Sequence, residues 1–79
     1  MELHIIYTES AMLVSKERFS SWREIQYRYA GFKTSLGPWE DEAVIAYLSD
    51  EYADLMPAAS IQVNGLLGSE AAGCVLTFQ

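Results

Sequence analysis

Two prolines bound the longest regular pattern in this chain, and that pattern constrains the fold more than any other feature. Between Pro38 and Met56 the residues read PWEDEAVIAYLSDEYADLM, with apolar side chains at spacings of one, three and four. At about 100° per residue, such positions gather into one stripe of an α-helix. Pro38 suits the first helical position, and Pro57 cannot continue a helix. The pattern therefore predicts a helix from Pro38 to Met56, with Gly37 as its N-cap.

This predicted helix has two faces of different character. The apolar stripe, which we expect in the core, consists of Val44, Ile45, Leu48, Tyr52, Leu55 and Met56. The opposite arc is acidic with two aromatics, and consists of Trp39, Ala43, Tyr47, Asp50, Glu51 and Asp54. No Lys or Arg follows Lys33, so no cation nearby in the sequence neutralises this arc. The arc is either a solvated face or a contact surface for a basic partner, since aromatics among polar groups are typical interface anchors.

The segments before this helix predict strands and a shorter helix. Leu3–Thr8 is apolar and partly β-branched, which favours a strand. Met12–Lys16 is interpreted as a returning strand or, because no Gly or Pro marks a turn, as a helical turn at 10–16. A capping box at Ser21 to Glu24, with Gly31 past the end, predicts a helix over Trp22–Ala30. Phe32–Leu36 then becomes a connector between the two helices.

The C-terminal third predicts further strands. Ser60–Val63 alternates like a strand, and the dipeptide Asn64-Gly65 is a strong hairpin signal. Two interpretations are open. Either Asn64-Gly65 is a turn that joins this strand to a strand at Leu66–Leu67, or the first strand continues to Leu67 with a bulge at Gly65. In both cases Cys74–Phe78 is a final strand.

Strands at both ends with helices between them indicate an α+β fold. We expect the 79 residues to form a single domain, 1–79, because the chain is too short for two. The element order is predicted as ββααββ or βααββ. In either order, a small antiparallel sheet from the N- and C-terminal strands is covered on one face by two helices.

The charge of the chain is divided unevenly along its length. Residues 1–33 hold five basic and four acidic groups, whereas residues 34–79 hold seven acidic groups and no basic one, for a net charge of −6. This charge repels phosphates, so we do not expect direct binding to nucleic acid. A basic protein surface is the natural partner.

Cysteine content and hydropathy indicate the compartment. Cys74 is the only cysteine, so the chain has no disulfide framework and suits a reducing cytoplasm, with Cys74 as a buried structural thiol. No apolar run approaches the ~20 residues of a membrane span, and MELHIIYTES does not resemble a signal peptide. We therefore expect a cytoplasmic protein that does not interact with a membrane.

The residue sets of common catalytic and metal sites are missing. His4 is the only histidine and is interpreted as a partly buried structural residue of the first strand. One His and one Cys cannot build a usual zinc site, and the acidic run Glu40–Glu42 lacks the loop of an EF-hand. Gly65–Ser69 lacks the lysine of a phosphate-binding loop. We therefore predict no catalytic residue, no metal and no cofactor, and no enzyme activity except as a subunit completing another chain's site.

In size, acidity, single-domain α+β build and lack of motifs, the whole chain resembles small phage-borne anti-CRISPR and antirestriction proteins. The resemblance implies a non-catalytic inhibitor, in the host cytoplasm if phage-encoded, that binds an effector complex and blocks target DNA access or nuclease recruitment. Helical geometry alone gives the expected partner-binding residues, which are Trp39, Glu40, Tyr47, Asp50, Glu51 and Asp54.

A second class of function stays open. The high apolar fraction suits a small homodimeric structural or regulatory protein, of the antitoxin or immunity kind, and Tyr27 lies off the inward face of the first helix. The basic residues leave two further alternatives. Arg23, Arg28 and Lys33 either contact an acidic part of a partner or pair with the acidic helix within the fold.

Overall fold

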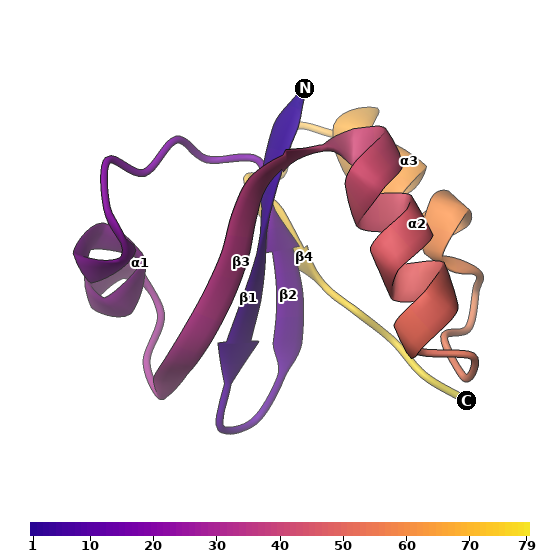
Figure 1. Cartoon of the computed structure of the whole chain (residues 1–79), viewed down its shortest axis with the longest axis horizontal. Helices are drawn as coiled ribbons and strands as arrows, with labels where there is room; N and C mark the ends of the chain where they lie inside the picture. The colour runs from indigo at the N-terminus through magenta and orange to yellow at the C-terminus, as the bar shows by residue number, and fades with distance from the viewer.

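The computed structural model describes residues 1–79 and shows a four-stranded antiparallel sheet with helices on both sides (Figure 1). In chain order the elements are β1 (Glu2–Thr8), β2 (Met12–Ser15), α1 (Trp22–Arg28), β3 (Phe32–Glu40), α2 (Asp41–Glu51), α3 (Ala59–Leu67) and β4 (Gly73–Val75). The strand order is β3-β1-β2-β4. Helices α2 and α3 cover one face of the sheet, and α1 lies on the other side.

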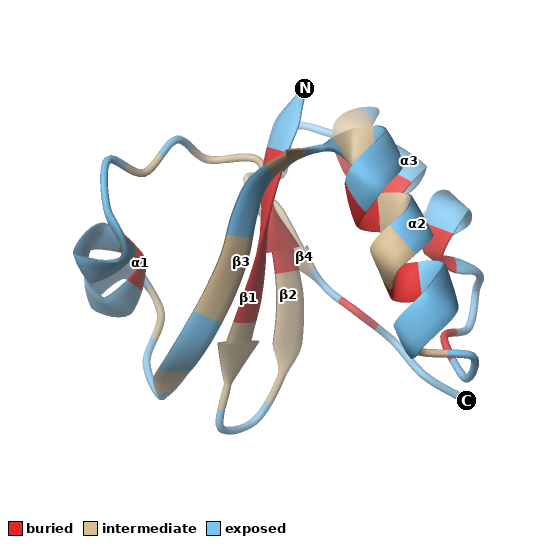
Figure 2. Cartoon of the chain, viewed as in Figure 1, coloured by how far each residue is buried: buried red, intermediate tan, exposed pale blue.

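Strand β1 is the central element because it is buried on both faces. Residues Leu3 to Ile6 are all buried, although successive side chains of a strand point to opposite faces (Figure 2). Leu3 and Ile5 belong to the cluster beneath α2 and α3. His4 and Ile6 point the other way, where Phe19 packs edge-on against the His4 ring at 5.3 Å. Continuous apolar character in Leu3–Ile6 thus reflects a strand enclosed between two layers.

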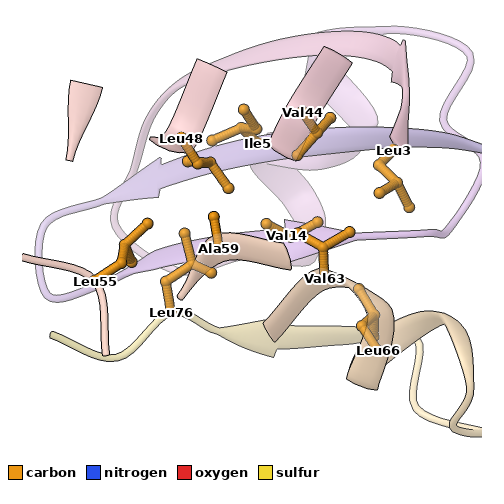
Figure 3. Packing of buried hydrophobic residues seen from close by; sticks show 10 residues of the cluster. All are labelled: Leu3, Ile5, Val14, Val44, Leu48, Leu55, Ala59, Val63, Leu66 and Leu76. Carbon is orange, nitrogen blue, oxygen red and sulfur yellow. The ribbon is translucent and has the colours of Figure 1, made fainter. Parts of the chain in front are cut away.

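The main core lies between the sheet and the α2–α3 layer (Figure 3). Val44 and Leu48, four residues apart, form the inner face of α2. The ten buried residues of this main core are Leu3, Ile5, Val14, Val44, Leu48, Leu55, Ala59, Val63, Leu66 and Leu76. They come from both ends and the middle of the chain, so no single segment can form this core by itself.

The predicted fold class is confirmed, with a different element order. The sheet is antiparallel and two helices cover one face, but these are α2 and α3. The helix predicted over Trp22–Ala30 was expected on that same face, and α1 lies instead on the other side. The observed order is ββαβααβ, because Phe32–Leu36 is part of β3 and not a connector. This segment pairs with the free edge of β1, with Ile5 opposite Leu36 and Ile6 opposite Ser35. Pairing satisfies backbone groups on β1 that would otherwise have no partner.

The predicted start of the long helix is wrong by three residues, and its end by five. Helix α2 begins at Asp41, with Glu40 as N-cap and no side-chain capping bond, and it ends at Glu51. Pro38 is a residue of β3, in which the Gly37–Pro38 peptide is cis. Gly37 is not the N-cap, because it has a φ of +110° and its Cα faces the Leu3 carbonyl so closely that an added Cβ would lie 2.7 Å from that oxygen.

The hairpin predicted at Asn64-Gly65 is also wrong, because both residues lie inside α3. Ala59, Val63 and Leu66 are buried and recur at spacings of four and three, which is a helical pattern. The turn signal of Asn64-Gly65 is local, and burial of this helical face outweighs it. Neither predicted strand, Ser60–Val63 or Leu66–Leu67, is present.

The remaining boundaries differ by a few residues. Helix α1 ends at Arg28, two residues before the predicted Ala30, and Gly31 has the expected left-handed φ of +73°. Ser21 is the N-cap without a side-chain bond, and the Glu24 carboxylate instead accepts the Ser20 N–H at 2.7 Å. Strand β4 ends at Val75, so most of the predicted Cys74–Phe78 strand is extended chain with one bridge from Phe78 to Leu55.

Replacing Gly65 with alanine tests whether residues 59–67 are helical. An alanine Cβ at Gly65 meets no atom within 4 Å, and glycine inside a helix costs stability. We expect Gly65→Ala to raise the free energy of unfolding by about 0.5–1 kcal/mol in urea denaturation.

A hairpin turn at Asn64-Gly65 would require a positive φ, and the same substitution would then destabilise the protein. Gly37→Ala is the matched contrast, since Gly37 has both a positive φ and the close Leu3 oxygen. It should lower the free energy of unfolding by more than about 1 kcal/mol.

Candidate functional site

The acidic residues gather at the two ends of α2 and not along a continuous arc. Glu40, Asp41 and Glu42 stand at its N-terminal end, and Asp50, Glu51 and Asp54 stand at or just past its C-terminal end. All except the half-buried Asp41 are exposed. The outward side of α2 between the two groups carries Ala43, Ala46 and Ser49.

Only the N-terminal group has counter-charges within the chain. The Met1 ammonium lies 3.3 Å from a Glu40 carboxylate oxygen and 3.6 Å from one of Asp41. Glu40 therefore raises the pKa of this ammonium, mainly through its hydrogen bond. The remaining ion pair joins Arg28 to Glu17 at 3.3 Å. Arg23, Arg28 and Lys33 thus form no ion pair with the acidic helix.

The C-terminal acids also face an unfavourable helix dipole. Carboxylates near the C-terminal end of a helix lie against its partial negative charge, and cations are preferred there. The last turn of α2 contains Asp50 and Glu51 but no basic residue. These carboxylates would therefore be stabilised by a cation supplied from outside the chain.

Two exposed apolar residues lie in the segment that follows α2 and in the C-terminal segment paired with it. Met56 and Phe78 are 57% and 41% exposed. Their segments are tied together, because the Met56 N–H donates to the Thr77 carbonyl at 3.1 Å and the Gln79 N–H donates to that of Asp54 at 2.9 Å. We call Asp50, Glu51, Asp54, Met56 and Phe78 the acidic surface. Met56 was predicted in the core stripe, and its exposure corrects that prediction.

The two aromatic residues expected on the acidic arc pack inward. Trp39 is in β3, not in the helix, and is half-buried against the main core. Its ring meets the Tyr47 ring at 5.4 Å, edge to face. Tyr47 is also half-buried, and its hydroxyl lies 3.5 Å from that of Tyr7. The structure therefore separates Trp39 and Tyr47 from the exposed carboxylates with which the helical pattern grouped them.

Tyr7 joins β1 to α2 through hydroxyl groups. Its oxygen lies 3.1 Å from the Tyr52 oxygen, in addition to the Tyr47 contact. Burial, assisted by these two hydrogen bonds, raises the pKa of the Tyr7 phenol. The phenol remains neutral near neutral pH, so this tyrosine cluster is a hydrogen-bonded structural contact.

The basic residues gather around α1. Residues 16–33 contain all five Lys and Arg and only Glu17 and Glu24 as acids, a net charge of +3. On the exposed side of α1, Trp22 and Tyr27 are 56% and 94% exposed, and the Arg23 guanidinium lies 5.5 Å from the centre of the Trp22 ring. We call Trp22, Arg23, Gln26, Tyr27 and Lys33 the α1 surface. The helical pattern placed Tyr27 away from the core, but it did not reveal that Trp22 is exposed.

A pocket lies at the end of the sheet beside His4. It has a volume of about 530 Å³, and its lining residues are Met1, Glu2, His4, Lys16, Glu17, Arg18, Phe19, Pro38 and Glu40. His4 is only 7% exposed and its Nδ1 has no hydrogen-bond partner. Burial lowers the pKa of His4, and the nearby Glu2 carboxylate opposes this effect. The pocket contains side chains of both charges. The Lys16 ammonium already donates hydrogen bonds to the Leu66 and Ser69 carbonyls.

No group of three or more His, Cys, Asp and Glu side chains is placed to hold a metal ion. Cys74 is half-buried, whereas a buried thiol was predicted, and its burial raises the pKa of the thiol. None of the helices combines the length and apolar character needed to cross a membrane.

Comparisons of the chain with protein-family models, with curated proteins and with solved structures find no match. The function must therefore be inferred from the chain's own surfaces.

The lowered pKa of His4 predicts a pH dependence of stability. The folded protein binds a proton at His4 less readily than the unfolded chain, whose histidine has a pKa of about 6.5. Protonation of His4 therefore does not affect stability well above that pH. As the pH drops below it, the unfolded chain binds the proton more readily, and the free energy of unfolding falls. Urea denaturation between about pH 5 and about pH 7 measures this slope, because carboxyl groups titrate lower.

His4→Gln is the matched variant, since glutamine is polar but does not titrate in this range. It should remove most of the slope. An equal slope in both proteins would contradict the assignment of the pH dependence to His4.

Proposed function

We propose that this protein is a non-catalytic binding module that docks its acidic surface on a basic surface of a protein partner. The observation that carries the proposal is the set of exposed carboxylates of Asp50, Glu51 and Asp54, which have no counter-ion within the chain and lie at the negative end of α2. A lysine- or arginine-rich partner supplies the missing cations. Complex formation therefore relieves an electrostatic cost of the free protein.

The acidic surface also contains the apolar area that a specific interface needs. Met56 and Phe78 provide exposed apolar groups next to the carboxylates. Protein interfaces commonly have an apolar centre surrounded by polar residues. Charge then gives long-range attraction and orientation, while desolvation of Met56 and Phe78 contributes affinity.

We further propose that the partner is a nucleic-acid-handling defence complex and that binding inhibits it. Basic channels that hold DNA or RNA present the complementary charge to this surface. A negatively charged protein bound in such a channel excludes nucleic acid without any catalytic residue. This is the mode of action that the resemblance to anti-CRISPR proteins implies, either by blocking target DNA or by preventing nuclease recruitment.

Charge reversal tests the acidic surface. We expect the triple variant Asp50→Lys, Glu51→Lys and Asp54→Lys to fold normally, because all three side chains are exposed, and to lose partner binding. The measurement is an affinity pull-down from bacterial lysate, followed by mass spectrometry. Recovered complexes are then assayed for binding to target DNA with and without the wild-type protein.

A second triple variant controls for net charge. Glu2→Lys, Glu9→Lys and Glu70→Lys also replaces three exposed acids and changes the net charge from −6 to 0, but leaves α2 intact. It should recover the same partner as the wild type. Equal recovery by the α2 variant, with native circular dichroism, would remove the acidic surface from the function.

Salt concentration provides an independent prediction. Contacts between exposed charges are screened over about 10 Å at 0.1 M salt. We therefore expect affinity for the recovered partner to fall steadily between about 0.05 M and about 0.5 M NaCl in a titration. An affinity that does not change with salt would indicate an interface dominated by Met56 and Phe78.

A further inference from the structure

The α1 surface has the composition of a binding site but no partner within the chain. Trp22, Tyr27 and Arg23 belong to the three residue types most enriched among interface hot spots. Tyr27 is almost fully exposed, and neither Arg23 nor Lys33 forms an ion pair. Burial of such aromatic side chains in a complex removes a large apolar area from water.

Two shallow hollows flank Gln26 on this surface. One, of about 370 Å³, lies between α1 and β3 and is lined by Trp22, Gln26, Phe32, Lys33, Thr34 and Ser35. The other, of about 300 Å³, is lined by Arg23, Gln26 and Tyr27. The hollows place exposed aromatic rings beside cationic side chains, so the occupant should combine apolar groups with carboxylates.

The same chain carries a surface with these properties. The acidic surface presents Met56 and Phe78 beside Asp50, Glu51 and Asp54. We propose that the α1 surface binds the acidic surface of a second copy of this chain. Apolar groups then meet aromatic ones, and three unpaired carboxylates meet the cations Arg23 and Lys33.

The positions of the two surfaces determine the kind of assembly. Helix α1 lies on one side of the sheet, and α2 and α3 lie on the other (Figure 1). A contact between different surfaces on opposite sides is heterologous, so a dimer leaves one α1 surface and one acidic surface free. The assembly is therefore head-to-tail and grows beyond a dimer.

Electrostatics makes this assembly weak and dependent on salt. Each copy has a net charge of −6, which opposes close approach at long range. At physiological salt this repulsion is screened over about 8 Å, whereas the molecule is 29 Å long. Apposed charges in the contact keep part of their attraction, so we expect a weak association.

The inference shares the acidic surface with the proposed function, and self-association competes with partner binding for it. The test uses only the purified chain, so that its failure leaves partner binding unaffected. Conversely, failure to recover the proposed partner from a lysate would not affect the self-association measured with the purified chain.

Sedimentation velocity over a concentration series provides the test, at low salt and at about 0.15 M salt. We expect the weight-average mass of the wild type to rise from the 8.9 kDa monomer past the dimer without a plateau at the dimer. Two variants each neutralise one surface. One combines Asp50→Asn, Glu51→Gln and Asp54→Asn, and the other combines Arg23→Gln and Lys33→Gln.

Each variant alone should weaken association roughly tenfold or more, because its remaining surface has no complementary partner. An equimolar mixture should form a dimer and nothing larger. In that mixture, the intact α1 surface of one variant binds the intact acidic surface of the other. The two neutralised surfaces bind no further copy, so the assembly stops at the dimer.

Three results would overturn the inference. The first is a wild type that stays monomeric at both salt concentrations up to the highest protein concentration. The second is a wild-type dimer that does not grow, which would indicate a two-fold contact between identical surfaces. The third is a monomer whose α1 surface binds a labelled oligothymidine, with binding lost in the Arg23→Gln and Lys33→Gln variant, which would assign this surface to single-stranded nucleic acid.

Discussion

Burial of β1 on both faces is the constraint on which the rest of this structure depends. Leu3 and Ile5 belong to the core cluster beneath α2 and α3, while His4 and Ile6 are buried on the other face, where Phe19 packs against His4. A strand in this position also needs hydrogen-bonding partners along both edges. The hairpin supplies β2 on one edge, and β3 supplies the other from the middle of the chain. The resulting three layers keep α1 away from α2, and so keep Arg23 and Arg28 away from the acidic residues at the C-terminal end of α2.

Charge separation is therefore a consequence of the fold as well as of the sequence. A chain with all its cations in residues 16–33 could fold so that they neutralise the acidic helix. Here the sheet stands between α1 and α2, and the three ion pairs of the chain leave Asp50, Glu51 and Asp54 without a partner. At the C-terminal end of α2 the carboxylates oppose the helix dipole, which lowers the stability of this helix end in the free protein. Sites that violate a local rule in this way are expected at functional surfaces.

The interaction surfaces differ in how far the sequence could reveal them. The exposure of Asp50, Glu51 and Asp54 followed from the helical period, because their positions lie away from Val44 and Leu48. Trp39 was grouped with them only because the helix was predicted to begin at Pro38. Tyr47 does lie in α2, but it packs inward against Trp39 and Tyr7. Met56 and Phe78 could not be placed on the surface from the pattern. Their exposure depends on how the segment after α2 meets the C-terminal segment, which is a contact between residues distant in sequence.

The sequence by itself determined the α+β class, strand β1, the centre of α2 and the uneven charge, since each is set by local period and composition. It left β2 open between a strand and a helical turn, and pairing with β1 decided for the strand. The tertiary structure decided β3 and α3. Phe32–Leu36 becomes a strand because β1 has an edge to pair, and residues 59–67 become a helix because their apolar face completes the core. In both segments the local signals were weak or contrary. Long-range pairing and burial involve more backbone groups and more apolar area than one turn signal can offset.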